Sequence, residues 1–157
     1  MYAHTMKPER LQKAFSQFDA YNAKDPNLEE FQGKAYPKEV LYAIRMTEKL
    51  EEFSPGAPEY LQLAARCQHI GRWEIPRNSY PMDRKGYLAW RNQLKLHHAK
   101  IAENILLSCE YDKATIDIVT FLLLKKELHK NPDTQLLEDI ICLITLMLLR
   151  PALRMKR

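Results

Sequence analysis

Glycine is scarce in this chain, with four among 157 residues. Few glycines, together with many Leu, Glu, Lys, Gln and Ala, favour helices over a turn-rich sheet. Long apolar runs are also absent: the longest, residues 140–149, contains a Thr, whereas a membrane-spanning helix needs about 20 residues. The N-terminus lacks the apolar core of a signal peptide. We therefore expect a helical domain without a transmembrane segment, and exclude collagen-like, disordered and repeat chains.

Cysteine is sparse as well. Cys67, Cys109 and Cys142 are odd in number and too widely spaced for a disulfide framework or a paired-cysteine metal site. Each lies among apolar residues, which predicts three buried thiols. Free thiols persist in reducing compartments, so we expect a cytoplasmic protein.

Acidic residues are missing from the last eight positions, where four Lys and Arg stand. Because the whole chain has a formal net charge of +4, the rest of it is balanced. The basic excess thus belongs to a tail and does not form a face of the domain. We expect no specific nucleic acid binding.

Apolar periodicity predicts six helices with short connections. Asp83, Asp112 and Asn131 suit N-cap positions, and no stretch shows the period-two pattern of a strand. Residues 24–36 are therefore predicted to be a loop. The expected fold class is all-α, a single domain of residues 8–149 between an N-terminal tail, 1–7, and a basic C-terminal tail, 150–157. The expected helices cover residues 8–23, 37–53, 58–70, 83–109, 112–128 and 131–149.

Positive charge is concentrated in residues 66–100, which hold eight Lys and Arg against two acids, and three of the five His. This density points to an anion-binding pocket, because the Arg guanidinium matches phosphate or carboxylate with paired donors. Solvated faces of the fourth helix would give the same count, so both interpretations stay open. The aromatic residues of the stretch are either a stacking wall for a base or, more commonly, a hydrophobic cover. They are Trp73, Tyr80, Tyr87 and Trp90.

Polar residues that need partners or a cavity occur on three otherwise apolar helices. His69 ends the third helix, His98 lies in the fourth, and Glu138 and Asp139 begin the sixth. The two acids either complement the helix dipole or face the interior. Helical folds build metal sites from histidines and carboxylates of separate helices. We predict that His69, His98 and Glu138 or Asp139 face one shared cavity, with a pocket lined by Arg72, Arg77 and Trp73 beside it.

Three strings carry a resemblance to a known family. They are residues 68–81 (QHIGRWEIPRNSYP), 37–47 (PKEVLYAIRMT) and 137–143 (LEDIICL). The set resembles the family catalogued as domain of unknown function 4202, over roughly residues 11–145. Fourteen ordered residues with a Trp and two Pro make the first string a specific signal.

The order of elements is also similar to the HD superfamily of metal-dependent phosphohydrolases, which are all-α. In that superfamily one helix ends in His-Asp-Ile-Gly-Lys, and residues 68–72 stand in its place. Residues 98–106 are similar to the string that opens the next helix. Tyr42 stands where the first His would be. The resemblance implies a divalent metal held by His69, His98 and Asp139, with Glu138 in reserve.

Three functions remain open. The first is an HD-like phosphohydrolase acting on a nucleotide or another small phosphorylated molecule, with the metal activating a water. The second is a non-catalytic anion- or nucleotide-binding module that kept the fold and lost the metal site. The third is a protein-interaction domain. The first two share a phosphate site at Arg45, Arg72, Arg77 and Lys126 and a pocket wall of Gln68, Trp73 and Tyr80.

The sixth helix yields a prediction about association. Its apolar residues spread around the whole helix, so one packed face cannot cover them. We expect its first half to be buried against the third and fifth helices, and residues from Leu146 onward to expose apolar side chains, with Arg150–Arg157 loosely docked at most. The exposed patch should cause self-association that increases with concentration, as light scattering would detect. A strictly monomeric protein would contradict this prediction.

Overall fold

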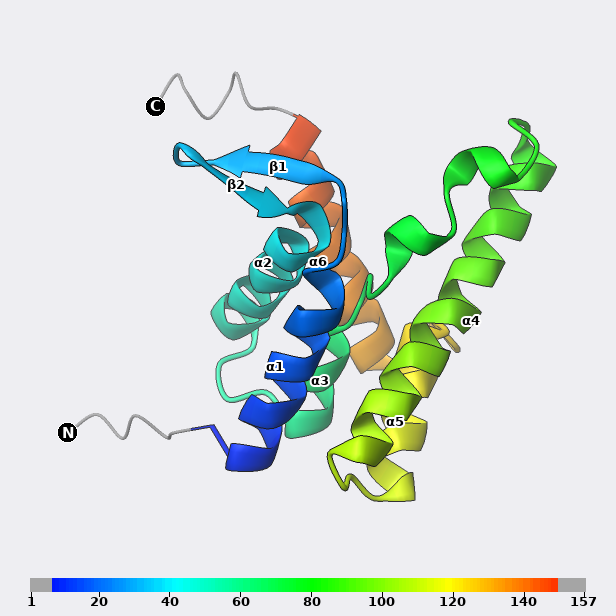
Figure 1. The fold of residues 1–157 in the computed structure, drawn as a ribbon. Helices are drawn as coiled ribbons and strands as arrows, with labels where there is room; N and C mark the ends of the chain where they lie inside the picture. The colour runs from blue at the N-terminus through cyan, green and yellow to red at the C-terminus, as the bar shows by residue number, and fades with distance from the viewer. Residues whose placement is uncertain (1–6, 150–157) are drawn as a thin grey trace.

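The computed structural model describes residues 7–149 as a helical domain with one small hairpin (Figure 1). The predicted all-α class and single domain are confirmed. The six α-helices of this part of the chain are α1 (Glu9–Asn22), α2 (Lys38–Phe53), α3 (Glu59–Arg66), α4 (Arg84–Ser108), α5 (Lys113–Leu123) and α6 (Pro132–Leu149). Two 3-10 helices, η1 (Arg72–Glu74) and η2 (Arg77–Ser79), lie between α3 and α4.

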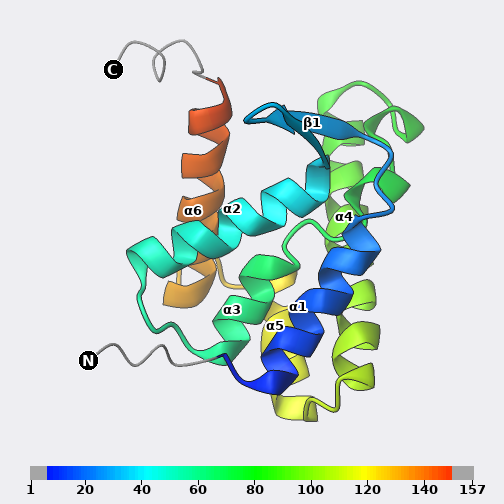
Figure 2. The same ribbon diagram turned by 60° about the vertical axis from the view of Figure 1, so that its left-hand side comes forward.

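Helix α3 occupies the centre of the domain (Figure 2). It contacts α1, α2 and α5, and Leu61, Leu63, Ala64 and Ala65 are buried. Its other four residues are half-buried, so neighbouring elements cover every side of this short helix. The long helix α4 packs mainly along α5. The end of α3 is therefore surrounded by other elements, and the candidate site lies there.

The predicted N-caps are confirmed. The Asp83 carboxylate accepts a hydrogen bond from the backbone N–H of Gly86 at 2.7 Å, and Asp112 accepts one from Thr115 at 3.1 Å. The Asn131 side-chain oxygen accepts from the N–H groups of residues 133 and 134 at 2.9 and 3.1 Å. Each cap satisfies donors that the first helical turn leaves free, which stabilises a helix by about 1 kcal/mol.

The predicted loop at residues 24–36 is wrong in part, because it contains an antiparallel hairpin. Strand β1 (Leu28–Phe31) pairs with β2 (Lys34–Pro37), with residue 28 opposite residue 37. Gln32 and Gly33 both have positive φ, as a two-residue type I′ turn requires. Both strands lie mostly exposed, so no apolar alternation marks them in the sequence.

Two predicted helices end early. Helix α3 stops at Arg66, four residues before the predicted end, and the chain turns through Gly71 at φ 68°. Helix α5 stops at Leu123 instead of Leu128, and Lys125 follows with φ 54°. Apolar or helix-favouring residues continue past both ends, which is why periodicity overestimates the two helices.

Helix α6 packs chiefly on α2, which the prediction did not include. Of the two predicted neighbours, α3 reaches the start of α6 through a hydrogen bond from the Tyr60 hydroxyl to Asp133 Oδ2 at 2.7 Å. The buried stripe of α6 is narrow, formed by Leu137, Ile140 and Ile144. Leu146, Met147 and Leu148 are exposed as expected. Arg150–Arg157 lie outside the described residues, and self-association stays a prediction.

The three cysteines are free thiols, but only Cys67 and Cys109 are buried. Cys142 is exposed because it faces away from the narrow stripe of α6, which corrects the expectation of three buried thiols. Over residues 7–149, no helix combines the length and apolar character that crossing a membrane demands. A cytoplasmic location stays a prediction.

Gly71 provides a stability test. A Cβ there would lie 2.6 Å from both Glu74 Oε1 and Ile101 Cδ1, whereas a Cβ on Gly56, which has nearly the same φ, meets nothing within 4 Å. Gly71→Ala combines left-handed strain with overpacking and should lower the free energy of unfolding by about 2–4 kcal/mol. Gly56→Ala adds only the backbone strain and should cost about 1 kcal/mol. Urea denaturation of both variants measures the difference, and equal losses would show that crowding at Gly71 is relieved.

Candidate functional site

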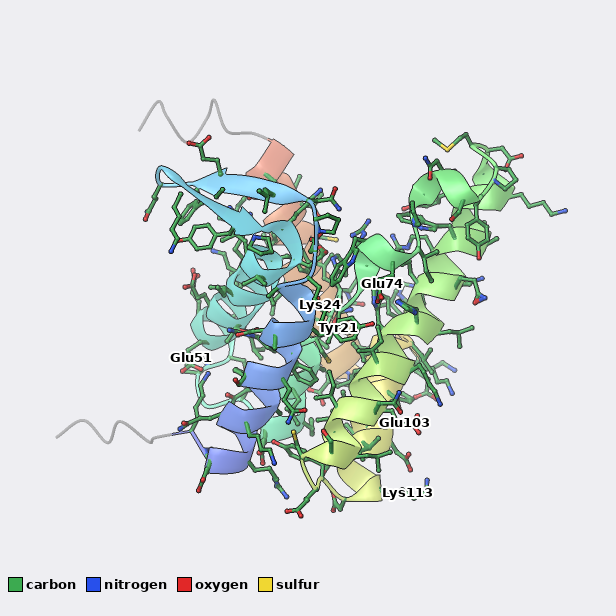
Figure 3. All side chains as sticks on the ribbon, in the orientation of Figure 1. Tyr21, Lys24, Glu51, Glu74, Glu103 and Lys113 are labelled. Atoms are coloured by element: carbon green, nitrogen blue, oxygen red, sulfur yellow. The ribbon has the colours of Figure 1, made fainter. Side chains whose placement is uncertain are left out.

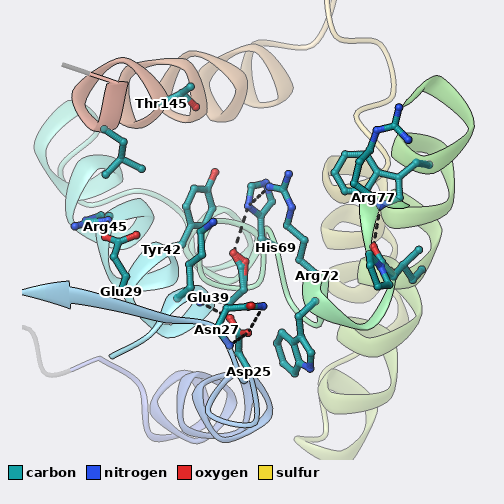
Figure 4. Close-up of a pocket in the computed structure, with 16 residues that line it drawn as sticks. Asp25, Asn27, Glu29, Glu39, Tyr42, Arg45, His69, Arg72, Arg77 and Thr145 are labelled. Atoms are coloured by element: carbon teal, nitrogen blue, oxygen red, sulfur yellow. Dashed lines mark hydrogen bonds and ion pairs between the residues drawn. The ribbon is translucent and has the colours of Figure 1, made fainter. Parts of the chain in front are cut away.

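Two adjoining cavities lie beyond the end of α3. The first, here the cationic cavity, has a volume of about 270 Å³ and lies between the residues after α3, helices α4 and α6, and the turn after α5. The second, the hairpin-side cavity, has about 470 Å³ and extends toward β1 and the start of α2 (Figure 4). His69, Arg72 and Thr145 line both cavities. The two volumes thus share a wall.

His69 stands at this shared wall. Its imidazole stacks on the Tyr42 ring, with centroids 4.0 Å apart and planes 7° from parallel. Its Nδ1 lies 3.2 Å from the Arg72 guanidinium and 4.0 Å from Glu39 Oε1. Burial, and then the positive charge of Arg72, hold the His69 pKa well below its ordinary value. The imidazole is therefore neutral at neutral pH.

His98 secures the segment that follows α3. Its Nδ1 lies 2.6 Å from the Ile70 carbonyl oxygen, and a carbonyl oxygen only accepts, so Nδ1–H is the donor. Burial lowers the His98 pKa to about 4, against the opposing effect of this hydrogen bond. The neutral ring leaves Nε2 as its acceptor nitrogen. The His69 and His98 ring centroids are 5.9 Å apart.

Positive charge dominates the cationic cavity. Four cations line it: Arg72 of η1, Arg91 and Lys95 of α4, and Lys125 from the turn after α5. The lining carries one carboxylate, Glu138, which pairs with Lys125 at 2.9 Å. Burial, and then Lys125 and Arg91, lower the Lys95 pKa. The cavity is therefore a region of positive potential lined by half-buried cations.

Glu39 is the unusual acid of the hairpin-side cavity. Its backbone N–H donates to Asp25 Oδ2 at 3.0 Å, so Asp25 caps the start of α2 from outside the helix. The side chain is buried, and Oε2 has no hydrogen-bond partner among the described residues. Burial raises the Glu39 pKa to about 7, with Arg72 opposing the shift and Asp25 adding to it.

Of the predicted metal ligands, His69, His98 and Glu138 line one cavity, and Asp139 does not. Asp139 is exposed and accepts a hydrogen bond from Gln135 at 2.8 Å. Consecutive helical residues point about 100° apart, so α6 can aim only one of its two acids inward.

Five of the predicted anion-binding and wall residues do not line the cationic cavity, among them Lys126, Tyr80 and Arg45. Lys126 is exposed and lines neither cavity, because the left-handed turn at Lys125 aims the earlier lysine inward. Tyr80 lines a separate open depression beside η2. Arg45 faces the hairpin-side cavity but pairs with Glu29 at 2.6 Å.

The remaining predicted residues border the two cavities. Gln68 is buried in the wall of the cationic cavity, and Arg77 and Trp73 line the hairpin-side cavity. Sequence reasoning did not single out Arg91 and Lys95 as site residues. Together with His98 they occupy positions i, i+4 and i+7 of α4, a spacing that places all three on one helical face.

The side chains present do not fit the divalent metal that the HD resemblance implies. Within residues 7–149, no three His, Cys, Asp or Glu side chains are arranged to hold a metal ion. The His98 Nδ1–H donates to the Ile70 carbonyl, so this nitrogen cannot ligate a metal, and Glu138 pairs with Lys125. Four cations around the same space also oppose a dication. The arrangement suits an anion instead.

The raised pKa of Glu39 predicts a pH effect on stability. The unfolded chain releases this proton near its ordinary pKa of 4.5, whereas the folded protein holds it until about pH 7. Wild-type stability should therefore fall as pH rises from about 4.5 to 7, and Glu39→Gln removes this loss. The free energy of unfolding of Glu39→Gln minus that of wild type should increase by about 2–4 kcal/mol across this range.

Denaturant titrations between pH 4 and 8 measure this difference. Glu51→Gln on the same helix is the matched control, because Glu51 is exposed and the same carboxyl-to-amide change is made outside the cavity. Asp25, Glu29, Lys38, Arg72 and His69 face Glu39 and stay present in both variants. A difference for Glu39→Gln that does not change with pH would contradict the raised pKa.

Comparisons with known proteins identify a family and nothing closer. No curated protein matches the chain, and no solved structure matches it. Residues 12–149 match the family described as Domain of unknown function (DUF4202). Since this match covers most of the chain, including α2, both cavities and most of α1, the protein belongs to the DUF4202 family.

Proposed function

We propose that the cationic cavity binds the phosphate group of a small phosphorylated molecule, and that the protein is a non-catalytic binding module. The observation that carries this proposal is the charge of the lining. Arg72, Arg91, Lys95 and Lys125 face one carboxylate, which is already paired. Glu138 pairs with Lys125, whereas Arg72, Arg91 and Lys95 are half-buried and form no ion pair with a described carboxylate. Partial desolvation of an unpaired charge is costly.

A bound phosphate would relieve the repulsion among these cations. Burial, and then the positive charges of Lys125 and Arg91, lower the pKa of Lys95, the direction expected from repulsion among these cations. A phosphate dianion would supply the missing negative charge, and guanidinium groups match its oxygens with paired donors. His98 is neutral, so it carries no negative charge that could take the place of a phosphate beside these cations.

The position of the Lys125 side chain supports a functional role. A non-glycine residue at φ 54° is strained by about 1 kcal/mol or more. This conformation directs the Lys125 side chain into the cavity, where it is 13% exposed. Glu110 and Glu127 have similar φ values and line neither cavity, so the support comes from where the Lys125 side chain lies and not from the strain.

Metal-dependent hydrolysis is the less supported alternative, because the described donors do not fit a metal. A distant relation to the HD superfamily remains part of the proposal. It is supported by the neighbouring positions of His69 and His98 and by Tyr42, which stacks on His69. In this view the protein kept the fold and replaced a metal site by an anion site.

Titration with inorganic phosphate and pyrophosphate tests the proposal, with affinity measured by calorimetry and the rise in Tm by thermal shift. Lys95→Met should weaken binding about 10- to 100-fold, the effect of losing one charge-assisted hydrogen bond. The unliganded variant should unfold at the same or a higher temperature, because one repelling cation is gone. Lys100→Met is the matched control, since Lys100 is exposed on the same helix and lines neither cavity.

Two results would contradict the proposal. One is the absence of phosphate and pyrophosphate binding at millimolar concentration, or binding that Lys95→Met leaves unchanged. The other is a stoichiometric divalent metal in the purified protein, accompanied by phosphatase activity. That result would favour the hydrolase alternative.

A further inference from the structure

The hairpin-side cavity presents buried polar atoms that no described residue satisfies. Glu39 is 5% exposed, and its Oε2 lacks a hydrogen-bond partner there. The Tyr42 hydroxyl, one helical turn away on α2, is buried and lacks one too. Buried polar groups in native proteins are nearly always hydrogen-bonded, so such a pair calls for an explanation. Figure 4 shows both side chains beside His69 and Arg72.

These two groups lie next to the phosphate site. Both line the hairpin-side cavity, which shares Arg72, His69 and Thr145 with the cationic cavity. A molecule that places its phosphate among the four cations therefore extends past Arg72 toward Glu39 and Tyr42. A carboxyl oxygen and a phenol hydroxyl together offer an acceptor and a donor, which is what ligand hydroxyl groups need.

Two of the three aromatic rings that line this cavity, those of Trp90 and Tyr42, are already occupied. Trp90 carries the guanidinium groups of Arg72 and Arg77 at 5.4 and 5.8 Å from its ring, and its Nε1–H donates to the Ile75 carbonyl at 2.8 Å. The Tyr42 ring is stacked on His69. A flat base would have to displace these groups to stack on Trp90 or Tyr42. The third ring, Trp73, is tilted against Tyr21, with centroids 6.0 Å apart and planes at 47°. Since two of the three rings are taken, the lining favours a ligand rich in hydroxyl groups over an aromatic one.

We propose that the two cavities together bind the phosphomonoester of a small hydroxylated carbon skeleton, a sugar phosphate or polyol phosphate. Lys95, Lys125 and the two arginines hold the phosphate, and Glu39 and Tyr42 hydrogen-bond the hydroxyl groups. This inference rests on the proposed phosphate site. It adds two claims to the proposed function: the hairpin-side cavity binds the rest of the ligand, and it prefers a hydroxylated skeleton to a base.

Calorimetry with three probes tests it: inorganic phosphate, glucose 6-phosphate and adenosine 5′-monophosphate. Glucose 6-phosphate should bind about tenfold or more tightly than inorganic phosphate, and adenosine 5′-monophosphate more weakly than glucose 6-phosphate. Tyr42→Phe keeps the ring on His69 and removes only the hydroxyl. It should reduce the advantage of glucose 6-phosphate several-fold and leave the affinity for inorganic phosphate unchanged.

Tyr36→Phe on β2 is the matched control, because Tyr36 lines neither cavity, and it should bind all three probes like wild type. Tighter binding of adenosine 5′-monophosphate than of glucose 6-phosphate would overturn the inference, as would a Tyr42→Phe variant with wild-type affinity for glucose 6-phosphate. If either result is found while inorganic phosphate binds and Lys95→Met weakens that binding, the proposed function stands and only the inference fails. If inorganic phosphate does not bind, both fail.

Discussion

The candidate site depends on how the chain leaves α3 after Arg66. Had the helix continued, its carbonyl groups would bond along the axis; instead the Ile70 carbonyl turns to accept from His98, and the Gly71 N–H donates to the buried Asn22 side chain at 3.2 Å. Gly71 makes this turn possible because its φ is positive, and a Cβ there would also press on the side chains of Glu74 and Ile101. Tyr21 donates to Glu74 just beyond the turn, at 2.6 Å, so α1 holds the same segment (Figure 3). One break in one helix thus places His69 and Arg72 at the shared wall.

Electrostatic repulsion and stability oppose each other at this wall. Four cations gathered around one paired carboxylate do not stabilise a folded chain, and an apolar lining would serve stability better. Binding sites commonly retain such unfavourable groups because the ligand supplies the compensating interactions. The two imidazoles do not increase this repulsion, because burial keeps both rings neutral.

Most of the fold could be predicted from the sequence, because amphipathic periodicity and the caps at Asp83, Asp112 and Asn131 are local signals. The hairpin could not, since its short strands are exposed on both faces and its turn is Gln32-Gly33 rather than Asn-Gly. Much of the site was visible as the dense cations of residues 66–100. The place of Lys125 was not, because it depends on a left-handed residue that no composition rule marks. Neither was the buried state of Glu39, which depends on tertiary packing.

The distribution of titratable groups distinguishes the two cavities. The charge of the cationic cavity rests chiefly on arginines and lysines, while its histidines stay neutral down to low pH, so its potential changes little around neutrality. Glu39, with a pKa of about 7, changes its charge in that range. When it is protonated it can donate as well as accept a hydrogen bond, and when it is ionised it only accepts. The hairpin-side cavity is therefore where the protonation state can alter what is recognised, and a phosphate bound beyond Arg72 would raise the Glu39 pKa further through like-charge repulsion.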